Sequence, residues 1–221
     1  MKKLTYIILA FLAALSAQAK DFIISTNNSS LMLTAMEGEA LKVRYYGDKI
    51  TMQDFDGTPK AWMDAYPVFG TSYSYPSCLQ LQHADGNQTL ALEYKNMTEE
   101  ATADGKLYRI EMQDKIYPVC VTVFYQTHDA QDIIETWTEI TNNEKKEIIL
   151  NHYDSGFMPI RRGDVWTSHL HGTWADETRV TTEKVDMGGM YIANTDGARN
   201  AHTTHPEIMI SLDGKPQENS G

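Results

Sequence analysis

Residues 168–177, SHLHGTWADE, bring two histidines, a tryptophan and two carboxylates within ten positions, a set compatible with a metal site or an acid–base site. On a β-strand, His169 and His171 would point to the same face, the arrangement in which two histidines chelate zinc or copper. A metal site needs a third and usually a fourth ligand, of which Asp176 or Glu177 could supply one. The other histidines are scattered along the chain (His83, His128, His152, His202 and His205). We therefore predict that this stretch holds no metal.

Acid–base chemistry is the second use for these side chains. His171 with Glu177 could move protons as in β-sandwich enzymes that epimerise aldoses. Glycoside hydrolysis would need two carboxylates that face each other across a sugar, and 30 acidic residues leave that pairing open. The sequence has no Gly-x-Ser-x-Gly elbow, phosphate-binding glycine loop or Cys-x-x-Cys pair. We therefore predict no catalytic residues and no cofactor, and the alternative for SHLHGTWADE is a structural hairpin or loop.

Residues 1–19 have the features of a secretory signal peptide. Lys2 and Lys3 form a basic start, residues 4–15 are an apolar run, and Ala17-Gln18-Ala19 supplies a small-residue cleavage site. The apolar run is shorter than the roughly 20 residues that a spanning helix needs, so we expect no membrane span after cleavage. The sequence predicts a periplasmic or secreted protein with one β domain over residues 20–221.

The charge balance excludes one class of partner. Because the leader contributes two lysines, 17 basic residues remain against 30 acidic ones, a net charge of −13. Nucleic acid binding needs a basic surface, so no nucleic acid partner is expected, and a neutral ligand suits the chain. Cys78 and Cys120 lie in apolar, strand-like runs, where either a disulfide or two buried free thiols would be compatible with export.

Nearly every segment after the leader alternates apolar and polar residues with a period of two. Residues 31–36 and 40–46 alternate around Glu37-Gly38-Glu39, and residues 79–83 and 89–94 alternate around an Asp-Gly turn, so both pairs predict hairpins. Further strands are predicted at residues 107–112, 119–125, 133–141, 147–153, 189–194 and 207–212. Because no segment shows a sustained 3.6-residue apolar stripe, we predict an all-β, antiparallel sandwich or barrel.

Two regions lack this alternation and are predicted to be long loops. The first, residues 47–67, carries Asp54, Asp56 and Trp62, and the second, residues 158–182, carries the opening stretch. Long ordered loops on β scaffolds often bind ligands, although they can also be plain connections.

Three stretches in order resemble the amino-terminal domain of glycoside hydrolase family 36, the retaining α-galactosidases of the raffinose and melibiose type. They are AYPVFG (65–70), LQLQHADGN (79–87) and DIIETWTEI (132–140), and the likeness continues through NNEKK (142–146), HGTWA (171–175) and ENSG (218–221). It covers roughly residues 40–221, and the ordered set is more specific than any single motif.

The resemblance implies a β-supersandwich, similar to the galactose-mutarotase fold, placed ahead of a (β/α)₈ barrel that carries the catalytic aspartates. Those barrel motifs do not occur here, so the resemblance predicts the leading piece of a homo-oligomeric α-galactosidase, incomplete at its C-terminal end and inactive by itself. Its partners would be the missing barrel and α-galactoside oligosaccharides. An Asp-Phe-Arg run typical of the family is replaced by Ser72-Tyr73-Ser74-Tyr75. Asp54, Asp56 and Trp62 remain the positional candidates for substrate binding.

Two other functions stay open at this point. The chain could be a free-standing, secreted carbohydrate-binding β-sandwich that holds sugars through Trp62, Trp166 and Trp174. It could also be an aldose-epimerase-like enzyme that uses His171 and Glu177.

Overall fold

The computed structural model describes residues 20–55, 63–72, 76–160, 163–187, 189–197 and 203–217. The chain divides into two compact units, with the boundary between Pro159 and Ile160. The described elements are β-strands and one short 3₁₀ helix, η1 (Met52–Phe55), and all paired strands run antiparallel, which confirms the predicted fold class. Within those residues, no helix is long and apolar enough to cross a bilayer.

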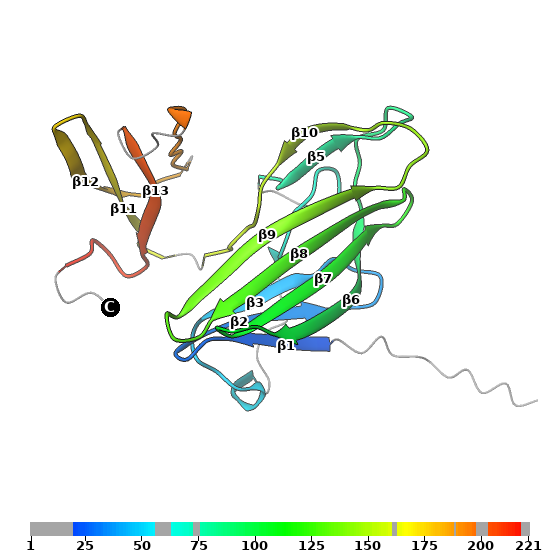
Figure 1. The fold of residues 1–221 in the computed structure, drawn as a ribbon, viewed down its shortest axis with the longest axis horizontal. Coiled ribbons are helices and arrows are strands. Elements are labelled where there is room, and N and C mark those ends of the chain that lie inside the picture. The colour runs from blue at the N-terminus through cyan, green and yellow to red at the C-terminus, as the bar shows by residue number, and fades with distance from the viewer. Residues whose placement is uncertain are drawn as a thin grey trace, which may run out of the picture. The chain divides into compact units, whose positions relative to one another are not determined.

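The first unit contains two four-stranded sheets that share one core (Figure 1). One sheet has the order β1 (Lys20–Ser25), β2 (Ser29–Ala35), β3 (Lys42–Asp48) and β4 (Met63–Asp64). The other has the order β6 (Leu92–Ala101), β7 (Lys106–Asp114), β8 (Val119–His128) and β9 (Ile133–Asn142). The predicted hairpin around Gly38 is confirmed by the pairing of β2 with β3.

The alternation along β8 shows why this sequence forms a sandwich. Val119, Val121, Val123 and Tyr125 all enter the shared core, and the residues between them point to the opposite face of the sheet. Burying one such side chain contributes about 1.5–3 kcal/mol, so a one-residue slip of β8 would remove four such contributions at once.

The predicted hairpin between residues 79–83 and 89–94 is wrong. β5 (Leu79–Gln82) pairs with β10 (Ile149–Tyr153), and β6 pairs with β7. The Asp-Gly turn forms as expected, but the chain after it turns away, since the N–H of Leu90 donates to the carbonyl of Phe69 at 2.9 Å. A local turn signal therefore did not decide the partner of β5.

The second unit is a three-stranded sheet in the order β12–β11–β13. It contains β11 (Trp166–Thr173), β12 (Asp176–Lys184) and β13 (Thr204–Ser211). Residues 158–182 were predicted to be a loop and residues 189–194 a strand, and both predictions are wrong: most of the first range lies in β11 and β12, and residues 189–194 lie outside every strand. Strands exposed on both faces need no apolar alternation, so β12 gives no strand pattern.

Candidate functional site

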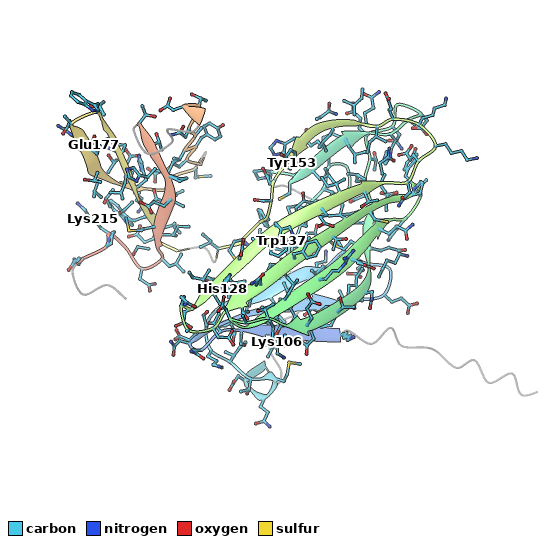
Figure 2. The ribbon with its side chains drawn as sticks, in the orientation of Figure 1. Lys106, His128, Trp137, Tyr153, Glu177 and Lys215 are labelled. Atoms are coloured by element: carbon cyan, nitrogen blue, oxygen red, sulfur yellow. The ribbon has the colours of Figure 1, made fainter. Side chains whose placement is uncertain are left out.

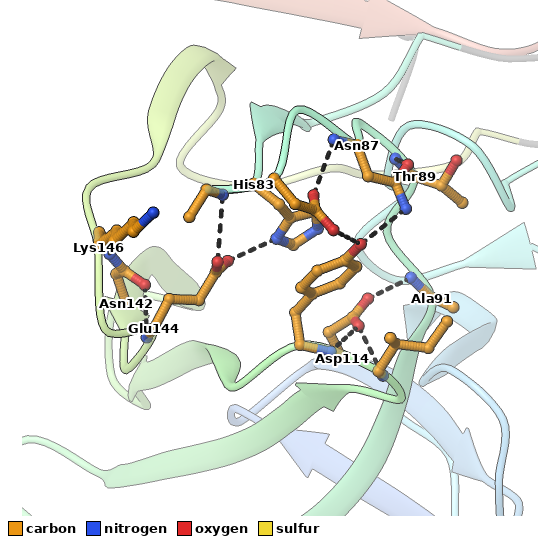
Figure 3. A network of polar contacts seen from close by, with 12 residues as sticks. His83, Asn87, Thr89, Ala91, Asp114, Asn142, Glu144 and Lys146 are labelled. Carbon is orange, nitrogen blue, oxygen red and sulfur yellow. Dashed lines mark hydrogen bonds and ion pairs between the residues drawn. The ribbon is translucent and has the colours of Figure 1, made fainter.

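His83 and Glu144 join two segments that lie far apart in the sequence (Figure 3). His83 follows β5, and Glu144 lies in the loop after β9. Nδ1 of His83 lies 2.7 Å from one carboxylate oxygen of Glu144, and the other oxygen accepts a hydrogen bond from the N–H of Ala84 at 3.2 Å. Asn142 shapes this loop, because its side chain accepts from the N–H of Glu144 and donates to the carbonyl of Lys146. The contact thus ties the end of β5 to the end of β9.

The His83 ring is closed off from solvent. Its side chain is 0% exposed and that of Glu144 is 8% exposed. The ring stacks on Tyr117, with centroids 3.6 Å apart and planes 12° apart. Nδ1 faces a carboxylate and must therefore carry a proton, whereas Nε2 is buried without a hydrogen-bond partner. The paired Nδ1 and the stacked ring offset the cost of burying that unpaired nitrogen.

Tyr117 extends the contacts to the Asp-Gly turn after β5. Its hydroxyl donates to Asp85 at 2.8 Å and accepts from the side chain of Asn87 at 3.0 Å. The backbone N–H of Asn87 first, and the Tyr117 hydroxyl second, hold the pKa of Asp85 below its ordinary value. Gly86 has a φ of +93°, which favours glycine at the centre of this turn. We call His83, Asp85, Asn87, Tyr117 and Glu144 the His83 network.

A buried carboxylate holds Tyr117 in place. Asp114, at the end of β7, is 4% exposed and accepts three backbone hydrogen bonds. The donors are the N–H groups of Ala91 at 2.6 Å and of Ile116 and Tyr117 at 2.8 Å each. They fix the turn between β7 and β8 against the chain that enters β6.

The His83 network positions loops and does not present a reactive group. A catalytic histidine must reach its substrate, and the His83 ring cannot, because solvent does not touch it. Reasoning from the sequence counted His83 among the scattered histidines and missed Glu144. A signal was present, since both residues lie in stretches that carry the family resemblance.

The AYPVFG stretch also has a packing role. Tyr66 is 1% exposed, and its hydroxyl donates to the carbonyl of Asp154 at 2.9 Å. Burial raises the pKa of Tyr66, so the phenol stays protonated. The N–H of Cys78 donates to the carbonyl of Pro67 at 2.8 Å. This stretch therefore joins the chain before β5 to the chain after β10.

Of the predicted substrate-binding residues, Asp54 alone lies within the described part of the chain. It is exposed on η1, and its carboxylate accepts hydrogen bonds from the N–H and the hydroxyl of Thr51 at 2.6 and 2.9 Å. These two donors, the backbone N–H first, lower the pKa of Asp54. Asp56 and Trp62 lie outside the described residues. A shared substrate role for the three stays a prediction.

The SHLHGTWADE stretch forms the β11–β12 hairpin. As predicted for a strand, His169 and His171 share one face, with ring centroids 5.6 Å apart. Nε2 of His171 lies 2.7 Å from the hydroxyl of Thr181, whereas Glu177 accepts the N–H of Ala175 at 3.0 Å. The two groups proposed as an acid–base pair thus contact other partners in the hairpin. Trp174 is 82% exposed at the turn.

The described side chains form neither a metal site nor a disulfide. Among the residues that the structure describes, no group of three or more His, Cys, Asp or Glu side chains could hold a metal ion. Cys78 and Cys120 are free thiols, the first buried and the second partly exposed. Burial raises the pKa of Cys78 to about 12, which leaves it unreactive near neutral pH.

A family model and several solved structures match this chain. Residues 39–221 match the glycosyl hydrolase family 36 N-terminal domain. The α-galactosidase of Lactobacillus brevis has a similar structure, with a TM-score of 0.76 at 19% identity over 87% of this chain and 31% of that chain. A comparison with curated proteins found no match.

Two other solved α-galactosidases agree with this result. The enzyme AgaA of Geobacillus stearothermophilus gives a TM-score of 0.73 at 17% identity over 86% of this chain and 31% of that one. The galactosidase domain of an α-galactosidase–sucrose kinase gives 0.75 at 18% identity, over 88% of this chain and 32% of that one. At these identities the likeness establishes the fold, and the chain spans about a third of each solved chain. The family match covers most of the sequence, and the chain therefore belongs to glycosyl hydrolase family 36, with the fold of the family's N-terminal domain.

Proposed function

We propose that this chain is the leading domain of an exported, retaining α-galactosidase that hydrolyses terminal α-galactosides. The family match over residues 39–221 carries the proposal. The substrates would be oligosaccharides of the raffinose and melibiose type. In support, variants of the Geobacillus enzyme have been solved in complex with raffinose and with stachyose.

The domain would support catalysis rather than perform it. Retaining hydrolysis needs a nucleophilic carboxylate and an acid–base carboxylate about 5–5.5 Å apart across the bond that breaks. In this proposal a (β/α)₈ barrel supplies both, and the sandwich supports the barrel and the homo-oligomer. The His83 network fits a supporting role, because it fixes loops and exposes no imidazole.

Export rests on the leader. The basic start, short apolar run and Ala17-Gln18-Ala19 would direct the protein to the periplasm or the medium. Mass spectrometry of the exported protein should give a chain that begins at Lys20. A mature protein that retains Met1 would refute this part of the proposal.

Hydrolysis of an aryl α-galactoside tests the division of labour. The purified chain, residues 20–221, should give no turnover, and the protein expressed from the full gene should hydrolyse the substrate. Turnover by residues 20–221 that disappears in His171→Ala or Glu177→Ala would refute the proposal and favour an epimerase-like site in the β11–β12 hairpin.

A further inference from the structure

The sheet of β6 to β9 has a second face that the core does not use. Along β8, Phe124 alternates with the core residues Val123 and Tyr125, so its ring points to the opposite face. The register places Arg109 of β7, Phe124 of β8 and Trp137 of β9 side by side in one row on that face. Figure 2 labels Trp137 on this sheet. We call this side of the sheet the outer face.

The three side chains in this row stack on one another. The rings of Phe124 and Trp137 are 4.8 Å apart at their centroids, with planes 4° apart, and the Arg109 guanidinium lies 5.5 Å from the centroid of Phe124. Two parallel rings this close must lie face to face, because rings side by side in one plane would collide. Phe124 is therefore covered by its neighbours and is 6% exposed. Cation–π attraction and ring stacking hold the row rigid.

Trp137 ends the row at an edge of the sheet. β9 is the last strand in the order β6–β7–β8–β9, so no further strand of this sheet stacks on the second face of the indole. The chain near Ser155 runs beside β9, where its carbonyl accepts the Thr138 hydroxyl at 2.9 Å. Thr138 points to the face opposite Trp137, so this contact does not cover the indole.

Hydrogen-bonding side chains frame the indole. Glu135 and Glu139 lie two residues before and after Trp137 on β9, so all three point to the outer face. The register sets Gln126 beside Glu135 and Thr122 beside Glu139. Both glutamates are exposed, and Glu135 also contacts the ring of His128 at 3.2 Å. An apolar ring face thus lies between groups that accept and donate hydrogen bonds.

We propose that the outer face around Trp137 binds a neutral, pyranose-containing oligosaccharide. The C–H face of a pyranose matches the flat indole, and its hydroxyls can donate to carboxylates on either side. Two carboxylates beside the ring disfavour an anionic sugar. A preformed, stacked ring also loses little side-chain entropy when the sugar binds. The inference does not depend on hydrolysis by the parent enzyme.

Saturation-transfer difference NMR with raffinose, and calorimetric titration, test this inference on residues 20–221. Raffinose should bind saturably, and its C–H protons should receive saturation from the protein. Trp137→Ala should weaken binding about tenfold or more, and Glu139→Gln should weaken it severalfold. Trp174→Ala removes a more exposed tryptophan and should change nothing. An oligomer of galacturonic acid should bind at least about tenfold more weakly than raffinose.

Several results would overturn the inference. Raffinose binding that survives both Trp137→Ala and Glu139→Gln would place the sugar elsewhere, and no binding at all would remove the site. An oligolysine peptide that binds more tightly than raffinose and depends on Trp137 would replace the sugar with a cationic peptide. If Trp137→Ala disturbs the fold, the Glu135→Gln/Glu139→Gln variant decides. Failure here leaves the hydrolysis test unaffected, so the two proposals fail independently.

Discussion

Replacing Glu144 with alanine should destabilise the first unit by about 2–3 kcal/mol. The variant removes the acceptor 2.7 Å from Nδ1 of His83, whose other ring nitrogen is already buried without a partner. A buried donor left unsatisfied costs about 1–3 kcal/mol, more when its lost partner was charged. The second lost bond, from Ala84, adds little because that N–H lies in an exposed turn and can bind water.

Urea unfolding followed by tryptophan fluorescence measures this loss. Glu147→Ala is the matched control, because Glu147 is exposed on the same loop and ordinary surface substitutions change stability by about 0.5 kcal/mol or less. With a slope of about 1–3 kcal/mol per molar urea, a loss of about 2–3 kcal/mol should lower the Glu144→Ala midpoint by about 0.7–3 M. A midpoint no lower than that of Glu147→Ala would refute the assignment of the His83 network.

A double variant tests whether Glu144→Ala destabilises the protein because His83 loses its hydrogen-bond acceptor or because a side chain is lost from the packing. His83→Phe with Glu144→Met replaces both partners by apolar groups of similar size, and phenylalanine can still stack on Tyr117. Removing both members of a buried polar pair costs less than removing one. The double variant should therefore be more stable than Glu144→Ala. If it is less stable, the network contributes through packing rather than through hydrogen bonding.

Three further predictions concern other parts of the chain. Hydrogen bonds hold the folded-state pKa of Asp132 low, and the side chain of Asn28 is the largest cause, followed by the Asn28 N–H and the Thr26 hydroxyl. The stability that these bonds contribute is therefore present above the ordinary carboxyl pKa of about 4 and is lost as the pH falls through the folded value. Asp132→Asn should reduce the loss of stability at acid pH, measured by urea unfolding at several pH values, and asparagine tolerates the φ of +56° at this position. An unchanged dependence of stability on pH would contradict the assignment. Iodoacetamide at pH 8 should alkylate Cys78 only after unfolding, and modification of the native protein, read by mass spectrometry, would show that the thiol is not buried. Residues 20–221 should bind a hydrophobic dye and self-associate through the exposed side chains of β13, and Ile208→Thr/Ile210→Thr should reduce both effects. A monodisperse monomer that binds no dye would favour a free-standing binding module.

Local pattern predicted those strands whose one face is buried. β8 could be located from its alternation, because every second residue enters the core. The β11–β12 hairpin could not, because Val180 is 60% exposed and the hairpin follows no buried stripe. Residues 189–194 carry apolar side chains without a strand, and Tyr191 is 90% exposed. Periodicity reports burial, so it fails where a strand buries little.

Pairing between strands that lie far apart in the chain was the second feature that the sequence could not predict. The Asp-Gly turn at Gly86 was visible, yet the partner of β5 lies at β10, which no local rule identifies. The contact of His83 with Glu144 spans 61 positions and depends on that pairing. The family resemblance had marked both ends of this contact without relating them. Physical reasoning from one sequence could therefore identify the two side chains but could not predict that they are in contact.

Proton NMR of raffinose hydrolysis tests whether the full protein is a retaining α-galactosidase. Retaining α-galactosidases release galactose first as the α-anomer, because two displacements at the anomeric carbon preserve its configuration. The protein expressed from the full gene should therefore produce α-galactose before mutarotation, while residues 20–221 under the same conditions produce none. Release of the β-anomer first, absence of hydrolysis by the full protein, or galactose release by residues 20–221 alone would contradict the account.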